Sequence, residues 1–179
     1  MNRAVSLALL LVVSLALVAA GCGGDDEPVP PDEWADSFCS AVSTWTDELG
    51  QIRDRFGDLS SLDRDSLEDA ANDASAATED LVNDLQALGE PDTESGQEIE
   101  QSIETLSDTL ETEKGDVEEA VEGVDDVTDI PSAITTIGAA FTAMGTALQD
   151  SFDAIENEDV RGEVTTALDQ SEACEGIVT

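Results

Sequence analysis

Hydrophobic residues recur at every third or fourth position along most of the chain, which is the spacing of one face of an α-helix. Such stripes occupy five stretches, at residues 34–59, 67–88, 99–124, 131–155 and 160–171. The first stripe consists of Trp34, Phe38, Val42, Trp45, Leu49, Ile52, Phe56 and Leu59. No stretch alternates hydrophobic and polar residues for long enough to predict a β-strand. We therefore expect an all-α protein.

Residues typical of helix ends separate these stripes. Asp65 with Glu68 predicts a capping box at the start of the second helix, and Gly89 with Pro91 predicts its end. Helices joined by such short connections pack as antiparallel neighbours. The pattern as a whole predicts an up-down four-helix bundle with a short fifth helix at the C-terminus.

The third and fourth helices have their own signals. Ser95 with Glu98 predicts a cap, and the pair Lys114–Gly115 interrupts the third stripe, which predicts a kink or a break there. Pro131 suits the first position of the fourth helix. The phase of the stripe then changes, so we expect a turn at 157–159.

The fourth helix includes an uncharged run from Ile130 to Gln149. Its length resembles a membrane span, but its threonines, serine, glutamine and two glycines argue against one. We expect a central bundle helix that is buried on several sides. Gly138 and Gly145 share one face, where they predict close approach of a neighbour such as the alanine-rich second helix.

The chain is strongly acidic. It has 43 Asp and Glu residues against six Lys and Arg, which gives a formal net charge of −37 at pH 7. Such a charge repels nucleic acids, so we expect no nucleic-acid partner. It favours a basic protein partner or weakly bound cations. Solubility alone also explains the charge, and we prefer that explanation to a dedicated cation site.

Catalytic chemistry has little support in the sequence. The chain has no His and no Tyr, which excludes a Ser-His-Asp triad and histidine metal sites. Glycine-rich nucleotide-binding and hydrolase motifs are also missing from the sequence. The acidic clusters at 63–66 and 125–129 lack the glycine and terminal glutamate of a calcium-binding EF-hand loop. We expect solvated helix ends there, and no enzyme activity, cofactor, catalytic site or metal site.

The first 21 residues have the pattern of an export signal. Arg3 precedes an uncharged stretch rich in Leu, Val and Ala, which ends in small residues before Cys22. Ala20, Gly21 and Cys22 resemble the lipobox of bacterial lipoproteins, although Ala19 stands where Leu is common. In that family the thiol receives a diacylglyceryl group, and cleavage frees the cysteine amine for further acylation. The resemblance implies a membrane anchor on Cys22 and a location on the extracytoplasmic face of the cell membrane.

The residues after Cys22 support this interpretation, because an acidic stretch rich in glycine and proline is typical of a tether. The division expected is a signal peptide at 1–21, a lipidated linker at 22–31 and a helical domain at 32–179. Two alternatives remain open. One is an uncleaved transmembrane anchor, and the other is an ordinary signal peptide that is cut near Ala20 without lipidation.

Two further cysteines lie near the two ends of the helical domain. Export places Cys39 and Cys174 in an oxidising compartment, so we expect a disulfide, with two free thiols as the alternative. Closing so long a loop contributes on the order of 5 kcal/mol in the chain-entropy model. Because the Cα atoms of a disulfide lie within about 7 Å of each other, the fifth helix must be short or oblique, or the topology must differ. We keep the disulfide and expect a short oblique fifth helix.

A loose resemblance extends to the helical domain. Phe38-Cys39 and Trp45 resemble the first helix of small uncharacterised helical lipoproteins of high-GC Gram-positive bacteria. That likeness implies an envelope location and no functional residues. The sequence favours a lipid-anchored interaction or cell-envelope structural module. The alternatives are a lipoprotein that binds cations or a small ligand in an apolar groove between helices, and a carboxylate-based hydrolase.

Overall fold

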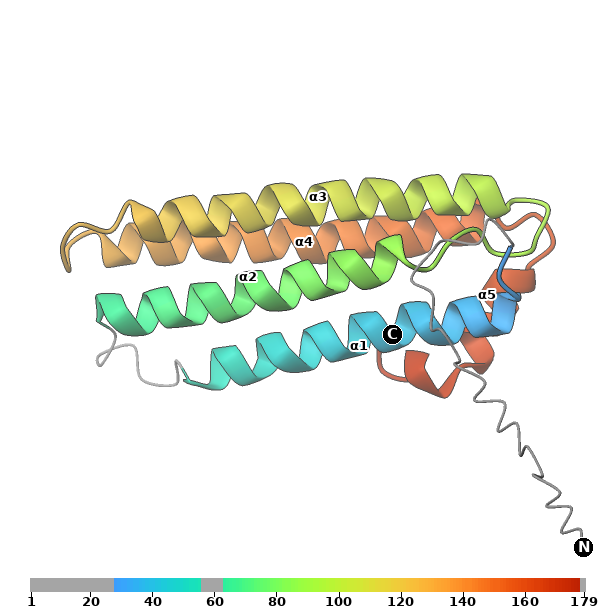
Figure 1. Cartoon of the computed structure of the whole chain (residues 1–179), viewed down its shortest axis with the longest axis horizontal. Helices are drawn as coiled ribbons and strands as arrows, with labels where there is room; N and C mark the ends of the chain where they lie inside the picture. Colours follow the sequence, from blue (N-terminus) through green and yellow to red (C-terminus); the bar gives the residue numbers. More distant parts are fainter. Residues whose placement is uncertain (1–27, 56–62, 178–179) are drawn as a thin grey trace, which may run out of the picture.

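The computed structural model describes residues 28–55 and 63–177, and its regular elements are helices. The four long ones are α1 (Pro31–Arg55), α2 (Arg64–Gln86), α3 (Gly96–Glu122) and α4 (Ile130–Glu158). They are followed by the short helix α5 (Glu163–Gln170) and a 3-10 turn, η2 (Glu172–Cys174). The long helices run alternately in opposite directions (Figure 1). The predicted all-α bundle with a short fifth helix is confirmed.

The long helices do not surround the core evenly. α2 packs between α1 and α3, and α3 packs along α4. α1 and α4 make no comparable contact, and α1 instead packs against α5 and η2. Figure 1 places α5 beside the beginning of α1, at one end of the bundle. The fifth helix therefore fills the space between α1 and α4 at that end alone.

The disulfide end, as we call this part of the bundle, contains Trp34, Phe38, Cys39, Phe152 and Cys174. Trp34 Nε1 donates a hydrogen bond to the carbonyl of Gly89 at 3.0 Å. The Phe38 ring lies stacked against that of Trp34 with centroids 5.3 Å apart, and the Phe152 ring meets it edge-on at 5.2 Å. Because Phe38 lies on α1 and Phe152 on α4, these aromatic rings join the two helices.

The two cysteines meet because the C-terminal segment turns back along α1. α5 has only eight residues, and η2 then brings Cys174 to Cys39, where the Cα atoms are 5.0 Å apart and the sulfur atoms lie at bonding distance. Asp159 supports the turn into α5, since its carboxylate accepts hydrogen bonds from the backbone N–H groups of Glu163 and Thr165 at 3.1 and 2.7 Å. The turn follows α4, which extends to Glu158, so two of the three residues predicted for the turn, Asn157 and Glu158, are still helical.

The cap of α2 differs from the prediction. Asp63 Oδ1 accepts the N–H of Ser66 at 2.9 Å, and Ser66 Oγ accepts the N–H of Asp63 at 3.1 Å. The capping box is therefore Asp63 with Ser66, and the predicted pair of Asp65 with Glu68 is wrong. Because the helix begins at Arg64, Asp65 is already inside its first turn, and Glu68 pairs with Arg64 at 3.1 Å.

Helix α3 also departs from expectation at two places. Ser95 stands at the predicted N-cap position, but its side chain makes no capping hydrogen bond. The predicted kink at Lys114–Gly115 is wrong, since α3 is continuous there. Leu110 and Val117 are both 1% exposed on either side of the glycine. Their burial outweighs the cost of one glycine in a helix, which is about 1 kcal/mol.

The expectation that α4 is buried on several sides is wrong. Its buried residues share one face, and they are Ile130, Ala133, Ala140, Met144, Leu148, Ser151 and Ile155. The outer face is uncharged and rich in threonine. The hydroxyls of Thr135 and Thr142 donate to backbone carbonyls one turn earlier, at 2.9 and 2.8 Å, so this face needs no polar neighbour.

The predicted role of the two glycines in α4 is likewise wrong. A Cβ atom built on Gly138 or Gly145 would meet nothing within 4 Å, so no helix approaches either residue closely. α4 packs most extensively along α3, and the alanine-rich face of α2 meets Phe141 of α4 without a close approach to either glycine. No helix within residues 28–55 and 63–177 has both the length and the apolar character that crossing a bilayer requires.

Candidate functional site

The space between α1 and α4 stays open in the half of the bundle away from the disulfide. We call it the α1–α4 cleft, and its volume is about 470 Å³. Its lining residues are Thr46, Leu49, Gly50, Ile52, Arg53, Leu67, Ile134, Ile137, Gly138 and Phe141. Small-molecule sites in proteins typically measure about 300–1,000 Å³ and have mostly apolar walls. The cleft meets both criteria.

The side chains that face each other here explain why the cleft is open. Leu49 and Phe141 contribute to its walls, but Gly50 of α1 and Gly138 of α4 bring no side chain. A Cβ atom on either glycine would meet nothing within 4 Å, so both leave empty space. No aromatic pair like that of Phe38 and Phe152 joins α1 to α4 among these lining residues.

The hydrophobic core divides at the same place. One large cluster fills the disulfide end and continues to the middle of the bundle. The other half has two small clusters, one around Ile52 and Ala74 and the other around Val117 and Ile130. Phe141 packs against the first of these, and Ile137 packs against the second. The cleft therefore lies between two parts of the core that do not merge.

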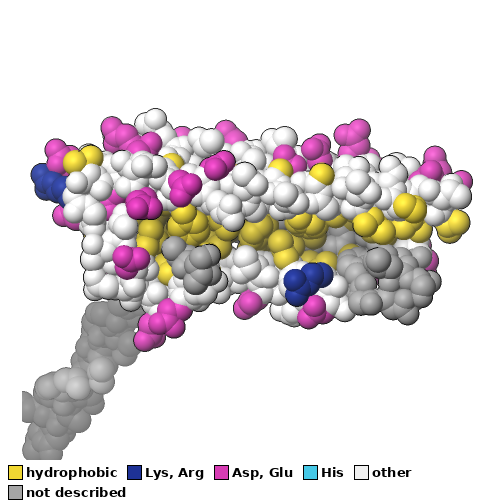
Figure 2. Space-filling model, turned by 180° about the vertical axis from the view of Figure 1, so that it is seen from behind, with side chains coloured by type: hydrophobic (Ala, Val, Ile, Leu, Met, Phe, Trp, Pro, Cys, Tyr) yellow, Lys and Arg dark blue, Asp and Glu magenta, His cyan; other side chains and the backbone are white. Residues whose placement is uncertain are grey.

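The charge of the cleft differs from that of the rest of the surface. None of the ten lining residues that the structure describes is acidic, although the chain has 43 acidic residues. Figure 2 shows a band of hydrophobic side chains between two ridges that carry acidic groups, with a basic side chain at the edge of the band. Arg53 is the one charged residue among these ten. Its Nη2 lies 3.5 Å from Oδ1 of Asp54, and both side chains are more than three-quarters exposed.

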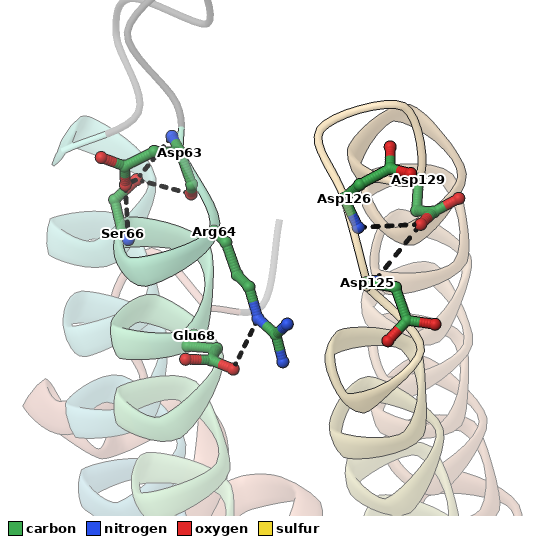
Figure 3. Close-up of polar contacts among 7 residues, drawn as sticks. All are labelled: Asp63, Arg64, Ser66, Glu68, Asp125, Asp126 and Asp129. Atoms are coloured by element: carbon green, nitrogen blue, oxygen red, sulfur yellow. Dashed lines mark hydrogen bonds and ion pairs between the residues drawn. The ribbon is translucent and has the colours of Figure 1, made fainter.

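In the two acidic clusters considered for calcium, carboxylates accept hydrogen bonds from the backbone of the chain itself (Figure 3). In the first, hydrogen bonds from the backbone and side chain of Ser66 hold the pKa of Asp63 below its ordinary value of 3.8. In the second, Asp129 Oδ2 accepts the backbone N–H groups of Asp125 and Asp126 at 3.2 and 3.1 Å. Hydrogen bonds from the side chain and backbone of Thr128 likewise lower the pKa of Asp126.

A second hollow, of about 570 Å³, lies between α1 and α2. Its lining includes the acidic residues Glu48, Asp73 and Asp80. Within the described parts of the chain, no three acidic or cysteine side chains come together in the way that metal ligands do. The geometry therefore gives more support to the apolar cleft than to a cation site.

Of the site residues expected from the sequence, the two that the structure describes lie apart from this cleft. Cys22, the predicted lipid attachment site, is outside the described residues. Cys39 and Cys174 meet at the opposite end of the bundle. Val29, which the sequence assigns to the linker, is hydrogen-bonded to the α2–α3 connection through Glu90 and Asp92, at 2.8 and 2.7 Å. Val29 therefore lies at the disulfide end of the bundle, beside the connection between α2 and α3.

The residues of the cleft were not among those singled out for binding. The helical spacing predicts that Leu49, Ile52, Ile137 and Phe141 face the core, which is correct for the direction of these side chains. It does not reveal that the apolar faces of α1 and α4 do not pack against each other here. The signal that could have found the cleft is the pair Gly50 and Gly138, because each replaces a side chain where two apolar stripes come together. Comparison of the chain with protein-family models, curated proteins and solved structures found no match.

Proposed function

We propose that the protein is an extracytoplasmic binding module, anchored by a lipid on Cys22, that holds a small apolar molecule in the α1–α4 cleft. The observation that carries the proposal is the cleft itself, an apolar space of about 470 Å³ with no acidic side chain among its described lining residues, in a very acidic protein. Of the functions that the sequence left open, small-ligand binding is the one that this geometry favours. None of the described residues that line the cleft is acidic, so a carboxylate-based hydrolase has no support there.

The position of the cleft suits a tethered module. The tether joins the domain just before Pro31, and the cleft begins near Thr46 and Leu49 on the same helix. At 1.5 Å per residue, Leu49 lies about 27 Å along the helix axis from Pro31. A lipid on Cys22 would hold the disulfide end near the membrane and leave the cleft accessible from the side.

Ligand binding is tested by photolabelling the full chain, purified as an expressing bacterium processes it and held in phosphatidylcholine nanodiscs. The probe is dodecanol with a diazirine at the end of its chain. We expect saturable labelling of peptides that line the cleft, from 46–53 and 134–141. Because the probe also dissolves in lipid, the measurement is the position of the label and not its total amount.

Two glycine variants of α4 sharpen this test. Gly138→Leu places a side chain in the cleft and should raise the half-saturating probe concentration by about tenfold, the equivalent of about 1.4 kcal/mol. Gly145→Leu makes the same change on the same helix outside the cleft lining, and should leave labelling unchanged. Equal labelling in Gly138→Leu and the parent protein would contradict the proposal.

The anchor is tested separately by growing the producing cells with an alkyne fatty acid. The supporting residues are Ala20, Gly21 and Cys22, which resemble a lipobox. The parent protein should incorporate the alkyne and stay in the membrane fraction, whereas Cys22→Ala should do neither. Equal incorporation by both proteins would show that Cys22 is not the lipid attachment site. That result would not bear on ligand binding in the cleft.

A further inference from the structure

From the position of Arg53 we infer that the ligand of the α1–α4 cleft is a single-chain amphiphile with an anionic carboxylate head, such as a fatty acid. This inference rests on the proposed binding function and adds the chemical class of the ligand. The apolar walls would hold the chain, and Arg53 would bind the head at the edge of the cleft. Three steps lead to it.

The first step is the size and shape of the cleft. A volume of about 470 Å³ lies in the lower half of the range for small-molecule sites, about 300–1,000 Å³. The lining follows α1 from Thr46 to Arg53 and α4 from Ile134 to Phe141, which is a span of about 10 Å along each helix. This volume and span favour one hydrocarbon chain over a lipid with two chains.

The second step is the distribution of basic residues. After Arg3 the chain has five, and three of them, Arg53, Arg55 and Arg64, fall within a stretch of twelve positions at the end of α1 and the start of α2. Arg64 is hydrogen-bonded to Glu68 at 3.1 Å. Arg53 is the basic residue among the described lining of the cleft. Charge complementarity at this edge therefore favours an anion.

The third step is the state of the Arg53 side chain. Its contact with Asp54 is long, at 3.5 Å, and lies in solvent. Exposed ion pairs of this kind contribute only about 0–1 kcal/mol, so a ligand can replace the contact at little cost. A carboxylate can accept two parallel hydrogen bonds from a guanidinium, which the geometry of Asp54 does not provide.

The overall charge of −37 opposes an anionic ligand at long range. At physiological ionic strength, however, the Debye length is about 8 Å, so distant carboxylates are largely screened. At contact distance a ligand head would meet the guanidinium of Arg53, the charged group among the described lining residues, and would take the place of the Asp54 carboxylate beside it. The local charge and the overall charge therefore predict opposite ligand preferences, and an experiment can separate them.

The experiment uses the full chain in phosphatidylcholine nanodiscs and three diazirine probes with the same twelve-carbon chain. Their heads are a carboxylate, a hydroxyl and a trimethylammonium group, and the pH is 8 so that the carboxylate is ionised. We expect the carboxylate probe to label the cleft peptides at the lowest concentration. Arg53→Gln should raise its half-saturating concentration about three- to tenfold, as expected for an exposed charge-assisted hydrogen bond.

Arg161→Gln is the matched control, since it removes the same charge from an arginine that pairs with Glu94 at 2.8 Å and does not line the cleft. It should leave all three half-saturating concentrations unchanged. Preferential labelling by the trimethylammonium probe, or equal carboxylate labelling in the parent and Arg53→Gln, would overturn the inference while leaving the binding function intact. If none of the three probes labels the cleft, the proposed function fails as well.

Discussion

The two ends of the bundle differ in how α1 and α4 pack against each other. At the disulfide end, α5 and η2 cover α1, and the rings of Phe38 and Phe152 meet between α1 and α4. At the cleft end the same two helices face each other across Gly50 and Gly138, and the space between them stays open. The core is continuous at one end and divided at the other.

This difference indicates that one half of the domain stabilises the fold and the other half binds the ligand. A half held by large aromatic side chains and a disulfide can supply most of the folding free energy. The other half can then expose apolar surface that a ligand covers. Binding sites are commonly drawn from the less stable parts of a structure. The arrangement predicts that substitutions at the disulfide end affect stability, whereas substitutions at the cleft end affect binding.

The largest effect should come from removing the disulfide. Cys39 and Cys174 are separated by 135 positions, and a loop of that length contributes about 5 kcal/mol in the chain-entropy model. The double variant Cys39→Ala, Cys174→Ala should lose about that much free energy of unfolding in urea titrations. A loss well below 1 kcal/mol would show that the disulfide end does not depend on this crosslink.

Truncation of one phenylalanine at each end gives a direct comparison. Phe38 is fully buried, so Phe38→Ala should cost about 3–5 kcal/mol, because it leaves a cavity in the core. Phe141 is half-buried beside the open cleft, so Phe141→Ala should cost about 1 kcal/mol and should weaken labelling by the dodecanol probe. Urea denaturation measures both losses. The contrast between the ends would be contradicted if the two variants lost equal stability.

The smallest effect concerns the cap of α2 at the cleft end. The pKa of Asp63 is held below 3.8 by its hydrogen bonds with Ser66, so its contribution to stability is present above that value. It is lost as the pH falls through the lowered pKa. Asp63→Ala should therefore lower the Tm by a few degrees at pH 7. Scanning calorimetry from pH 7 to pH 2 should show the difference from the parent protein shrinking only below about pH 4.

The sequence was sufficient to predict the helices because their apolar stripes are long and regular. It also predicted the meeting of Cys39 with Cys174, since few partners were available and export favours disulfides. Predictions that depended on one or two local residues were less reliable. The capping box begins at Asp63 and not at the predicted Asp65. Helix α3 has no kink at Gly115, because buried residues on either side hold the helix straight.

The cleft could not be predicted from the spacing of apolar residues. The stripes of α1 and α4 look alike along their whole length, and periodicity gives the direction of a face but not the distance to the opposite helix. That distance depends on where α5 packs, which is a property of the whole fold. The uncharged run of α4 led to the wrong prediction of burial on several sides. Its threonine hydroxyls donate hydrogen bonds to backbone carbonyls of the same helix, so an uncharged face can lie on the surface.

Amide hydrogen exchange of the full chain, with and without dodecanoate, tests the difference between the two ends most directly. Without ligand, amides in 46–53 and 134–141 should exchange faster than those in 34–42 and 148–155. Dodecanoate should slow exchange in the first two segments and leave the last two unchanged. Uniform exchange along α1 and α4, with no segment slowed by dodecanoate, would contradict a closed disulfide end and a ligand-binding cleft.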